Sequence, residues 1–118
     1  MITPASLNMT IYQGSTFYKR FTWKENRRDP IDITGYTFRM QIRPTRDSDE
    51  VIDEFSSASG DFYIEDATNG VFVLELSHTK TESMDFDRGV FDIECTFQDG
   101  RVSRIIQGEV CLSRGVTR

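Results

Sequence analysis

The sequence predicts an all-β protein, an antiparallel β-sandwich of about seven to nine strands with at most one short helical turn. Apolar and polar residues alternate with a period of two along most of the chain, and glycine or polar turns interrupt the alternation roughly every 8–12 residues. The length of 118 residues suits one domain with a single core. We therefore expect one domain over residues 1–118, with short polar tails at 1–6 and 113–118.

Six strands are predicted in the first two-thirds of the chain. The clearest is 36–43, where apolar residues face one way and polar residues the other until Pro44, which cannot donate to a ladder. Lys19 is the exception on the apolar face of its strand, and the charged stretch 24–30 is expected to be a loop. The acidic strand 51–55 is expected at a sheet edge, where charge discourages stray pairing. The six predicted strands cover 7–12, 17–23, 36–43, 51–55, 62–64 and 71–76.

The last third is predicted to form a hairpin of strands 89–97 and 102–112. Asp99 and Gly100 are typical of a two-residue loop with a primed turn, which would place Gln98 opposite Arg101. Gly108 is a candidate for a bulge that resets the register. The pairs expected from this loop are Phe97–Val102, Cys95–Arg104 and Ile93–Ile106.

Residues 77–84 break the alternation and contain the one predicted helical turn. Ser77 or Thr79 could cap this turn, because a serine or threonine hydroxyl accepts from the first free N–H groups of a helix. Glu82 would complete a capping box with Thr79.

The charge is negative overall and unevenly placed. The net charge is −5 and the pI about 4.8, which argues against broad binding to nucleic acid phosphates. Residues 47–66 hold eight acids and no base, residues 19–28 hold five bases against one acid, and residues 101–118 hold four bases against one acid. These are either solvated surfaces or patches that dock against copies of the chain or neighbouring proteins.

No motif predicts catalysis, a metal site or a cofactor. His78 is the one histidine, and Cys95 and Cys111 are expected to be reduced, small apolar residues. The acids at 47–50 and 85–87 could approach a cation, but neither stretch has the spacing of a calcium loop. Tyr12, Tyr18 and Tyr63 fall on the outward parity and, with Trp23 if it is exposed, could form a platform for a sugar. No apolar run is long enough to span a membrane, and the N-terminus is not a secretory signal.

Seven stretches carry a sequence resemblance: 13–17, 21–23, 30–36, 40–43, 70–77, 89–94 and 108–110. Together they resemble a family of small bacteriophage and prophage virion proteins. The part from Ile31 to Ile42 is also similar to the N-terminal domain of phage baseplate upper proteins. The resemblance implies an immunoglobulin-like sandwich that attaches receptor-binding or fibre proteins to the phage tail. Unlike the longer baseplate proteins, this chain is expected to form one domain only.

The function expected from the resemblance is structural and not enzymatic: a tail or baseplate adaptor, present in several symmetric copies. Its partners would be other phage structural proteins, with no nucleic acid or membrane partner, and it would be made in the bacterial cytoplasm and reside in the virion. A capsid decoration or neck protein, and a carbohydrate-binding module, are the alternatives. The candidate interface residues are Lys24, Arg27, Arg28, Asp47, Asp49, Glu50, Arg114 and Arg118.

Overall fold

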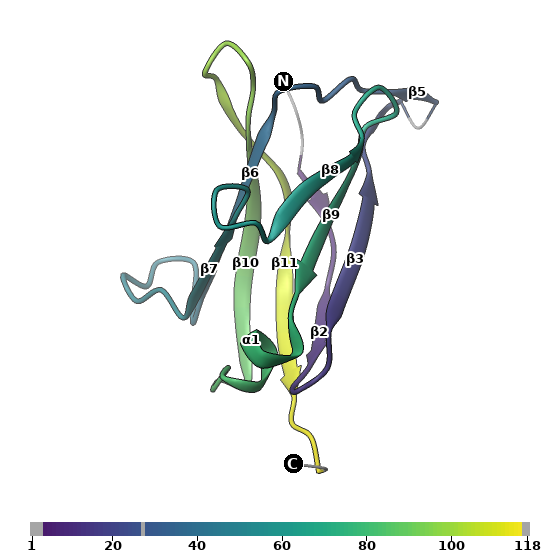
Figure 1. The fold of residues 1–118 in the computed structure, drawn as a ribbon. Coiled ribbons are helices and arrows are strands. Elements are labelled where there is room, and N and C mark those ends of the chain that lie inside the picture. Colours follow the sequence, from purple (N-terminus) through teal and green to yellow (C-terminus); the bar gives the residue numbers. More distant parts are fainter. Residues whose placement is uncertain (1–3, 27, 117–118) are drawn as a thin grey trace.

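The computed structural model describes residues 4–26 and 28–116, which form eleven strands and one short helix (Figure 1). No helix in these ranges is long and apolar enough to cross a membrane. The elements are β1 (Ala5–Ser6), β2 (Met9–Tyr12), β3 (Phe17–Thr22), β4 (Lys24–Glu25), β5 (Asp29–Pro30), β6 (Thr37–Arg43), β7 (Asp53–Ser56), β8 (Phe62–Asp66), β9 (Val71–Leu76), α1 (His78–Glu82), β10 (Arg88–Thr96) and β11 (Val102–Ser113).

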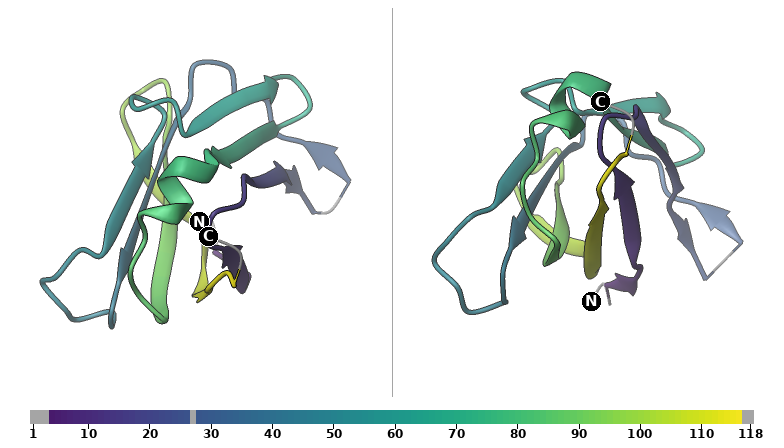
Figure 2. Two further views of the ribbon diagram at one scale, coloured as in Figure 1. Left: turned by 60° about the horizontal axis from the view of Figure 1, so that its bottom comes forward. Right: turned by 90° about the horizontal axis from the view of Figure 1, so that it is seen from below.

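Nine of these strands build two sheets that lie face to face when viewed down the long axis (Figure 2). The larger sheet has the order β1-β11-β10-β6-β7, with β2 also on β11, and the smaller has the order β3-β9-β8. The strands β6, β7, β10 and β11 share the larger sheet while β3, β8 and β9 form the smaller one, as in immunoglobulin variable-type domains. The fold is therefore an immunoglobulin-like β-sandwich, which confirms the predicted fold class.

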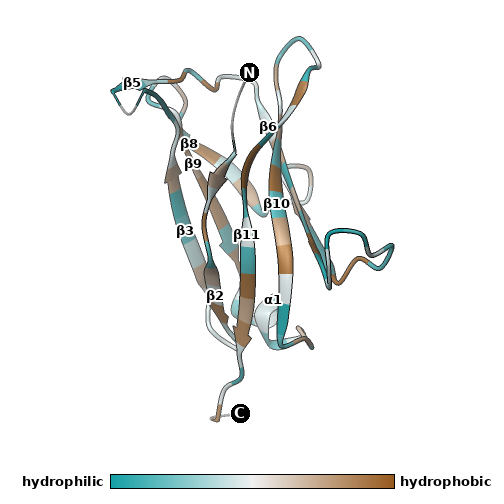
Figure 3. Cartoon of the chain, turned by 180° about the vertical axis from the view of Figure 1, so that it is seen from behind, coloured by the Kyte–Doolittle hydropathy of each residue, from teal (hydrophilic) through white to brown (hydrophobic). Residues whose placement is uncertain are grey.

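The core lies between the sheets and is built by the predicted inward parities. Along β10, buried and half-buried residues alternate from Gly89 to Thr96, and Figure 3 shows hydrophobic and hydrophilic stretches along both β10 and β11. At the centre, the Phe38 ring stacks on Phe72 with centroids 4.0 Å apart, and Phe72 stacks on Phe21 at 4.9 Å. These aromatic contacts join β6 of one sheet to β9 and β3 of the other.

The predicted register of the β10–β11 hairpin is right at its base and wrong at its tip. Ile93 faces Ile106 as predicted, but Cys95 faces Ser103 instead of Arg104. The Phe97 N–H donates to the Arg101 carbonyl over 2.8 Å, so the loop has three residues and Phe97 does not face Val102. Gly100, with φ at 88°, supplies the left-handed residue that follows a type I turn in such loops.

The bulge that compensates for this longer loop also differs from the prediction. The register shifts between Ile93 and Glu94, opposite Ile105, and not at Gly108. As a result, the consecutive residues Ile105 and Ile106 are both buried.

Three other segments refine the predicted elements. Residues 24–30, predicted as a loop, contain the two-stranded β4–β5 hairpin, whose turn includes Asn26 at a φ of 52°. Ala5 and Ser6, which were predicted to lie in a short polar tail, instead pair in parallel with Ile106 and Gln107 of β11. The acidic strand is confirmed at the edge of the larger sheet, as β7.

The helix α1 is capped at its first predicted position. The Ser77 hydroxyl accepts from the Lys80 N–H over 3.1 Å, so the third helical residue is Lys80 and no capping box with Glu82 forms. Lys80 also anchors the helix to the β7–β8 turn, because its ammonium lies 2.6 Å from the buried Asp61 carboxylate and 5.4 Å from the centre of the Phe55 ring.

Gly108 is required where the N-terminal strand passes from β1 to β2 along β11. A Cβ at Gly108 would lie 1.7 Å from the Leu7 carbonyl oxygen, a distance at which the backbone must move. The Leu7 N–H donates to Gln107 and the Asn8 side chain accepts from the Glu109 N–H, so the crossing is held on both sides.

We expect Gly108→Ala to lower the free energy of unfolding by about 1–3 kcal/mol, because the new methyl group displaces the N-terminal strand. The measurement is a urea titration followed by circular dichroism. Glu109→Ala, at the exposed neighbouring position, serves as the control and should change stability by less than about 0.5 kcal/mol. Equal stability of the two variants would contradict the close approach at Gly108.

Candidate interaction surfaces

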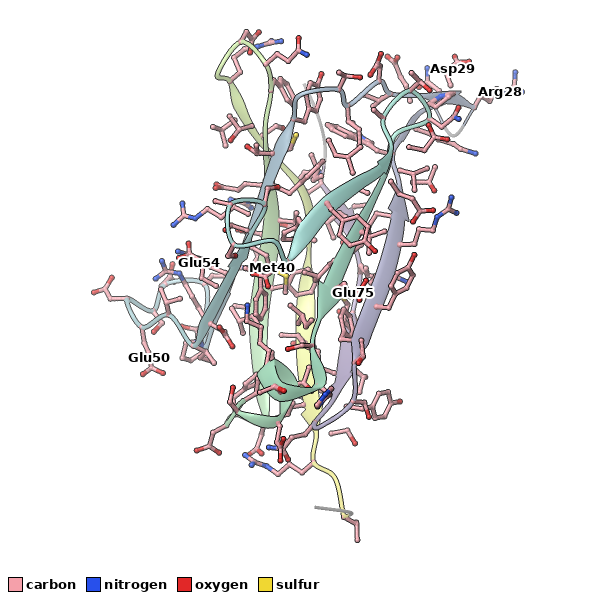
Figure 4. The ribbon with its side chains drawn as sticks, viewed as in Figure 1. Arg28, Asp29, Met40, Glu50, Glu54 and Glu75 are labelled. Carbon is pink, nitrogen blue, oxygen red and sulfur yellow. The ribbon has the colours of Figure 1, made fainter. Side chains whose placement is uncertain are left out.

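The basic candidates Lys24 and Arg28 lie on the β4–β5 hairpin, at one end of the sandwich. Both side chains are exposed, and Figure 4 shows Arg28 and Asp29 reaching away from the body of the protein. The turn is closed by the Arg28 N–H, which donates to the Glu25 carbonyl over 3.0 Å. Arg27 lies outside the described residues. The hairpin therefore presents two cations, beside the exposed acids Glu25 and Asp29, on a short projecting arm.

The acidic candidates Asp47, Asp49 and Glu50 lie in the loop between β6 and β7, which projects from the side of the sandwich (Figure 1). All three side chains are exposed. The loop has a defined shape, because the Arg43 guanidinium donates to the Ser48 carbonyl over 2.7 Å. In Figure 4, Glu50 and Arg28 extend in different directions from opposite sides of the molecule. The acidic and basic candidates thus form separate surfaces on one chain.

Arg114 is engaged within the chain. Its guanidinium lies 3.1 Å from Asp85 and 3.3 Å from Asp87, and these carboxylates raise the pKa of Arg114. The contact holds the segment after β11 against the segment before β10. The second candidate of this tail, Arg118, lies outside the described residues.

A further polar surface, which was not predicted as a site, covers the solvent face of the larger sheet. It surrounds a shallow hollow of about 480 Å³. Register brings its charges into rows across the strands: Glu94 of β10 lies between Arg39 of β6 and Arg104 of β11. The polar residues that line the hollow include Arg39, Gln41, Arg43, Asp92, Glu94 and Arg104.

Hydrogen bonds hold these side chains in place. Gln41 and Arg39 both donate to the Glu54 carboxylate, and these bonds lower the pKa of Glu54. Gln41 in turn accepts from Arg43 over 2.9 Å, while Arg104 lies 3.5 Å from Asp92. A fixed pattern of both charge signs suits recognition of a complementary protein surface. The outward parity of these residues is visible in the sequence, but only the strand order shows that they are neighbours.

Two of the three outward tyrosines lie on the solvent face of the smaller sheet. The Tyr63 hydroxyl donates to Glu75 over 2.9 Å, which raises the pKa of Tyr63 to about 12. The Tyr18 hydroxyl donates to Glu65 over 3.2 Å. Tyr12 lies on β2 of the other sheet, and Trp23 is half-buried against Tyr36 and Phe97. The structure therefore forms a platform from Tyr18 and Tyr63 alone.

Comparisons with known proteins return a fold likeness and no family. No family model matches the chain, and no curated protein matches it. Among solved structures, a structure of murine CRIg is similar, with 17% sequence identity, coverage of 95% of this chain and 93% of that chain, and a TM-score of 0.42. The assignment of an immunoglobulin-like topology rests on the strand order and register of this chain itself.

Asp53 of β7, beside the acidic loop, is a carboxylate whose ionisation is opposed mainly by burial. Its side chain follows the inward parity, and burial is the main cause that raises its pKa. A raised pKa means that the folded state binds the proton more tightly than the unfolded state does. Ionised Asp53 therefore destabilises the fold at neutral pH, and this penalty disappears as the pH falls through the pKa of the folded state.

We expect Asp53→Asn to raise the thermal midpoint at neutral pH, because the amide keeps the acceptor for the Glu54 N–H without the buried charge. The gain should vanish below about pH 3.5, where an ordinary aspartate is itself mostly protonated. Thermal denaturation at both pH values measures it, with Asp49→Asn in the exposed loop as the control. A gain that persists in acid would show that charge is not the cause.

Proposed function

We propose that the protein is a non-enzymatic structural component of a bacteriophage virion, an adaptor that joins tail, baseplate or fibre proteins in several symmetric copies. The observation that carries the proposal is the separation of two charged, projecting surfaces on one sandwich: the β4–β5 arm, where residues 24–29 hold three bases and two acids, and the loop with Asp47, Asp49 and Glu50. Separate charged surfaces on different sides of a chain allow it to contact two neighbours at once.

The phage setting of the proposal is supported by the sequence resemblance alone. The resembling stretches include Gly70, whose added Cβ would lie 2.5 Å from the Trp23 carbonyl oxygen. They also include Asp32, which accepts from the Thr34 N–H over 3.0 Å. These residues shape strand entries and turns, so they support a shared architecture. Such an adaptor is made in the bacterial cytoplasm and then resides in the particle.

Immunogold electron microscopy of purified phage particles, combined with mass spectrometry, tests the proposal. Label at the distal tail is the expected result. Label on the head or neck would replace the adaptor with the alternative role of capsid decoration or neck protein. Absence of the protein from the particles by mass spectrometry would overturn the virion role.

We expect reversal of the arm with Arg27→Glu and Arg28→Glu to lower incorporation into particles at least roughly tenfold while leaving the fold intact, because reversed charges at a contact repel the partner. Quantitative mass spectrometry of particles and thermal denaturation of the purified variant measure the two effects. His78→Glu, exposed on α1 at the other end of the sandwich, is the matched control. Equal incorporation of both variants would remove the arm from the interface.

A carbohydrate-binding role is the second candidate, favoured by the exposed Tyr18 and Tyr63 with carboxylates beside them. Rings flanked by hydrogen-bonding groups can stack on and orient a sugar. We expect this role to show as retention on insoluble polysaccharides that Tyr18→Ala and Tyr63→Ala both abolish, with Tyr12→Phe on the other sheet as the control. Absence of retention across a polysaccharide panel would exclude it.

A further inference from the structure

Lys80 of α1 and Asp61 of the β7–β8 turn form an ion pair at the border of the core. The Lys80 Nζ lies 2.6 Å from Oδ1 of Asp61, and the Asp61 side chain is only 8% exposed. The centre of the fully buried Phe55 ring lies 5.4 Å from the same Nζ. Because burial of a charge is costly, a reaction that joins the two groups in a neutral bond removes that cost.

This pair differs from the other ion pairs within residues 4–26 and 28–116. In each of the others the cation is an arginine, and the carboxylate side chain is at least 39% exposed. A guanidinium keeps its proton and does not act as a nucleophile, whereas the amine of a lysine does so once it is deprotonated. Lys80 and Asp61 thus bring an amine nucleophile against a buried carboxyl group.

The two oxygens of the Asp61 carboxylate are held differently. Oδ1 faces the Lys80 ammonium. Oδ2 accepts from the Ser59 hydroxyl over 2.6 Å and from the Ser56 N–H over 3.4 Å. If an amine attacks Cγ, negative charge develops on an oxygen at which two donors are already aimed. Oδ1, which lies beside the protons of Lys80, is then the oxygen placed to leave as water.

A third carboxylate can carry protons at this position. Asp53 of β7 is half-buried, and burial is the main cause that raises its pKa. The charges of Lys80 and Asp61 also act on the pKa of Asp53, the first lowering it and the second raising it. A carboxylate that accepts a proton readily suits general acid–base catalysis near neutral pH.

We propose that Lys80 and Asp61 join through an amide bond between their side chains, which fastens α1 to the β7–β8 turn. The amine lone pair forms the bond to Cγ, and the bond from Cγ to Oδ1 breaks with its electron pair. The two protons that the ammonium loses leave with that oxygen as one water molecule, and Asp53 takes up and returns a proton on the way. No oxidant or cofactor is needed. The bond goes beyond the proposed function and does not depend on it.

Contact between the two groups is what favours the condensation over hydrolysis. Reacting groups held together in one molecule behave as if one were present at about 10⁵–10⁸ M. Lys80 is half-buried, so the released water can pass to solvent. The product closes a ring of the chain from 61 to 80 that includes β8 and β9.

The test is the mass of the purified full chain, measured after denaturation. The expected mass is lower than the sequence mass by one water molecule. Digestion after glutamate residues then locates the loss, because cleavage after Glu65 and Glu75 separates Asp61 from Lys80 in the sequence. Peptides 55–65 and 76–82 should appear as one joined species.

Two variants remove the reacting groups. Lys80→Arg keeps a cation opposite Asp61 but has no amine, and Asp61→Ala has no carboxyl carbon to attack. Both should retain the full sequence mass and give separate peptides. Lys19→Arg is the matched control and should keep the loss of water, because Lys19 is half-buried but forms no ion pair within the described part of the chain.

Asp53→Asn tests the proton transfer. This variant should reach the same final mass as the parent chain, but at least about tenfold more slowly in a time course after cell-free synthesis. Equal rates for the two chains would remove Asp53 from the reaction.

A parent chain with the full sequence mass would overturn the proposed bond. A loss of water that persists in Lys80→Arg would also overturn it, as would a dehydrated peptide 55–65 that is not joined to 76–82, because Asp61 would then have cyclised with its own backbone.

Discussion

The placement of the N-terminal strand against β11 is the constraint on which the rest of the structure depends. β1 and β2 run parallel to β11, and Gly108 allows the chain between them to press against the β11 backbone. A side chain at this position would separate the two strands. The same placement keeps the first strand off β3, so the smaller sheet retains an open edge beside the core. Gly108 thus permits the close contact with which the N-terminal strand completes the larger sheet.

The two lateral edges of the sandwich carry inward charges of opposite sign. Lys19 follows the inward parity on β3, and Asp53 does so on β7. Each residue places a charged group at the border of the core, where an apolar side chain would pack. Partial burial at this position raises the pKa of Asp53. Pairing of like edges would place two lysines or two aspartates near each other, which disfavours symmetric strand addition. The edges are thus protected against indiscriminate association.

The fold class could be predicted from the sequence because its main signal is local. Alternation along 36–43 and 89–97 fixes which side chains enter the core, and a strand needs no knowledge of its neighbour to show this pattern. The tip of the last hairpin was mispredicted because Asp-Gly suits both a two-residue loop and the end of a three-residue loop. A bulge opposite Ile105 absorbs the extra residue, so the base keeps the predicted register. The Gly108 contact with Leu7 was hidden because it joins residues about a hundred positions apart.

Candidate surfaces were harder to predict than the fold, since a surface depends on which strands become neighbours. Composition alone identified the acidic loop and the basic arm because each is contiguous in sequence. The row formed by Arg39, Glu94 and Arg104 comes from three strands, and only the order β6-β10-β11 assembles it. For Arg114 the prediction of a free interface residue was wrong. Its partners Asp85 and Asp87 lie far from it in the sequence, so the ion pairs could not be recognised there. A cation already paired within the chain gains less from an outside carboxylate than a free one does. Within residues 4–26 and 28–116, Lys24, Arg28, Asp47, Asp49 and Glu50 form no ion pair, so the arm and the acidic loop are better placed to bind neighbours.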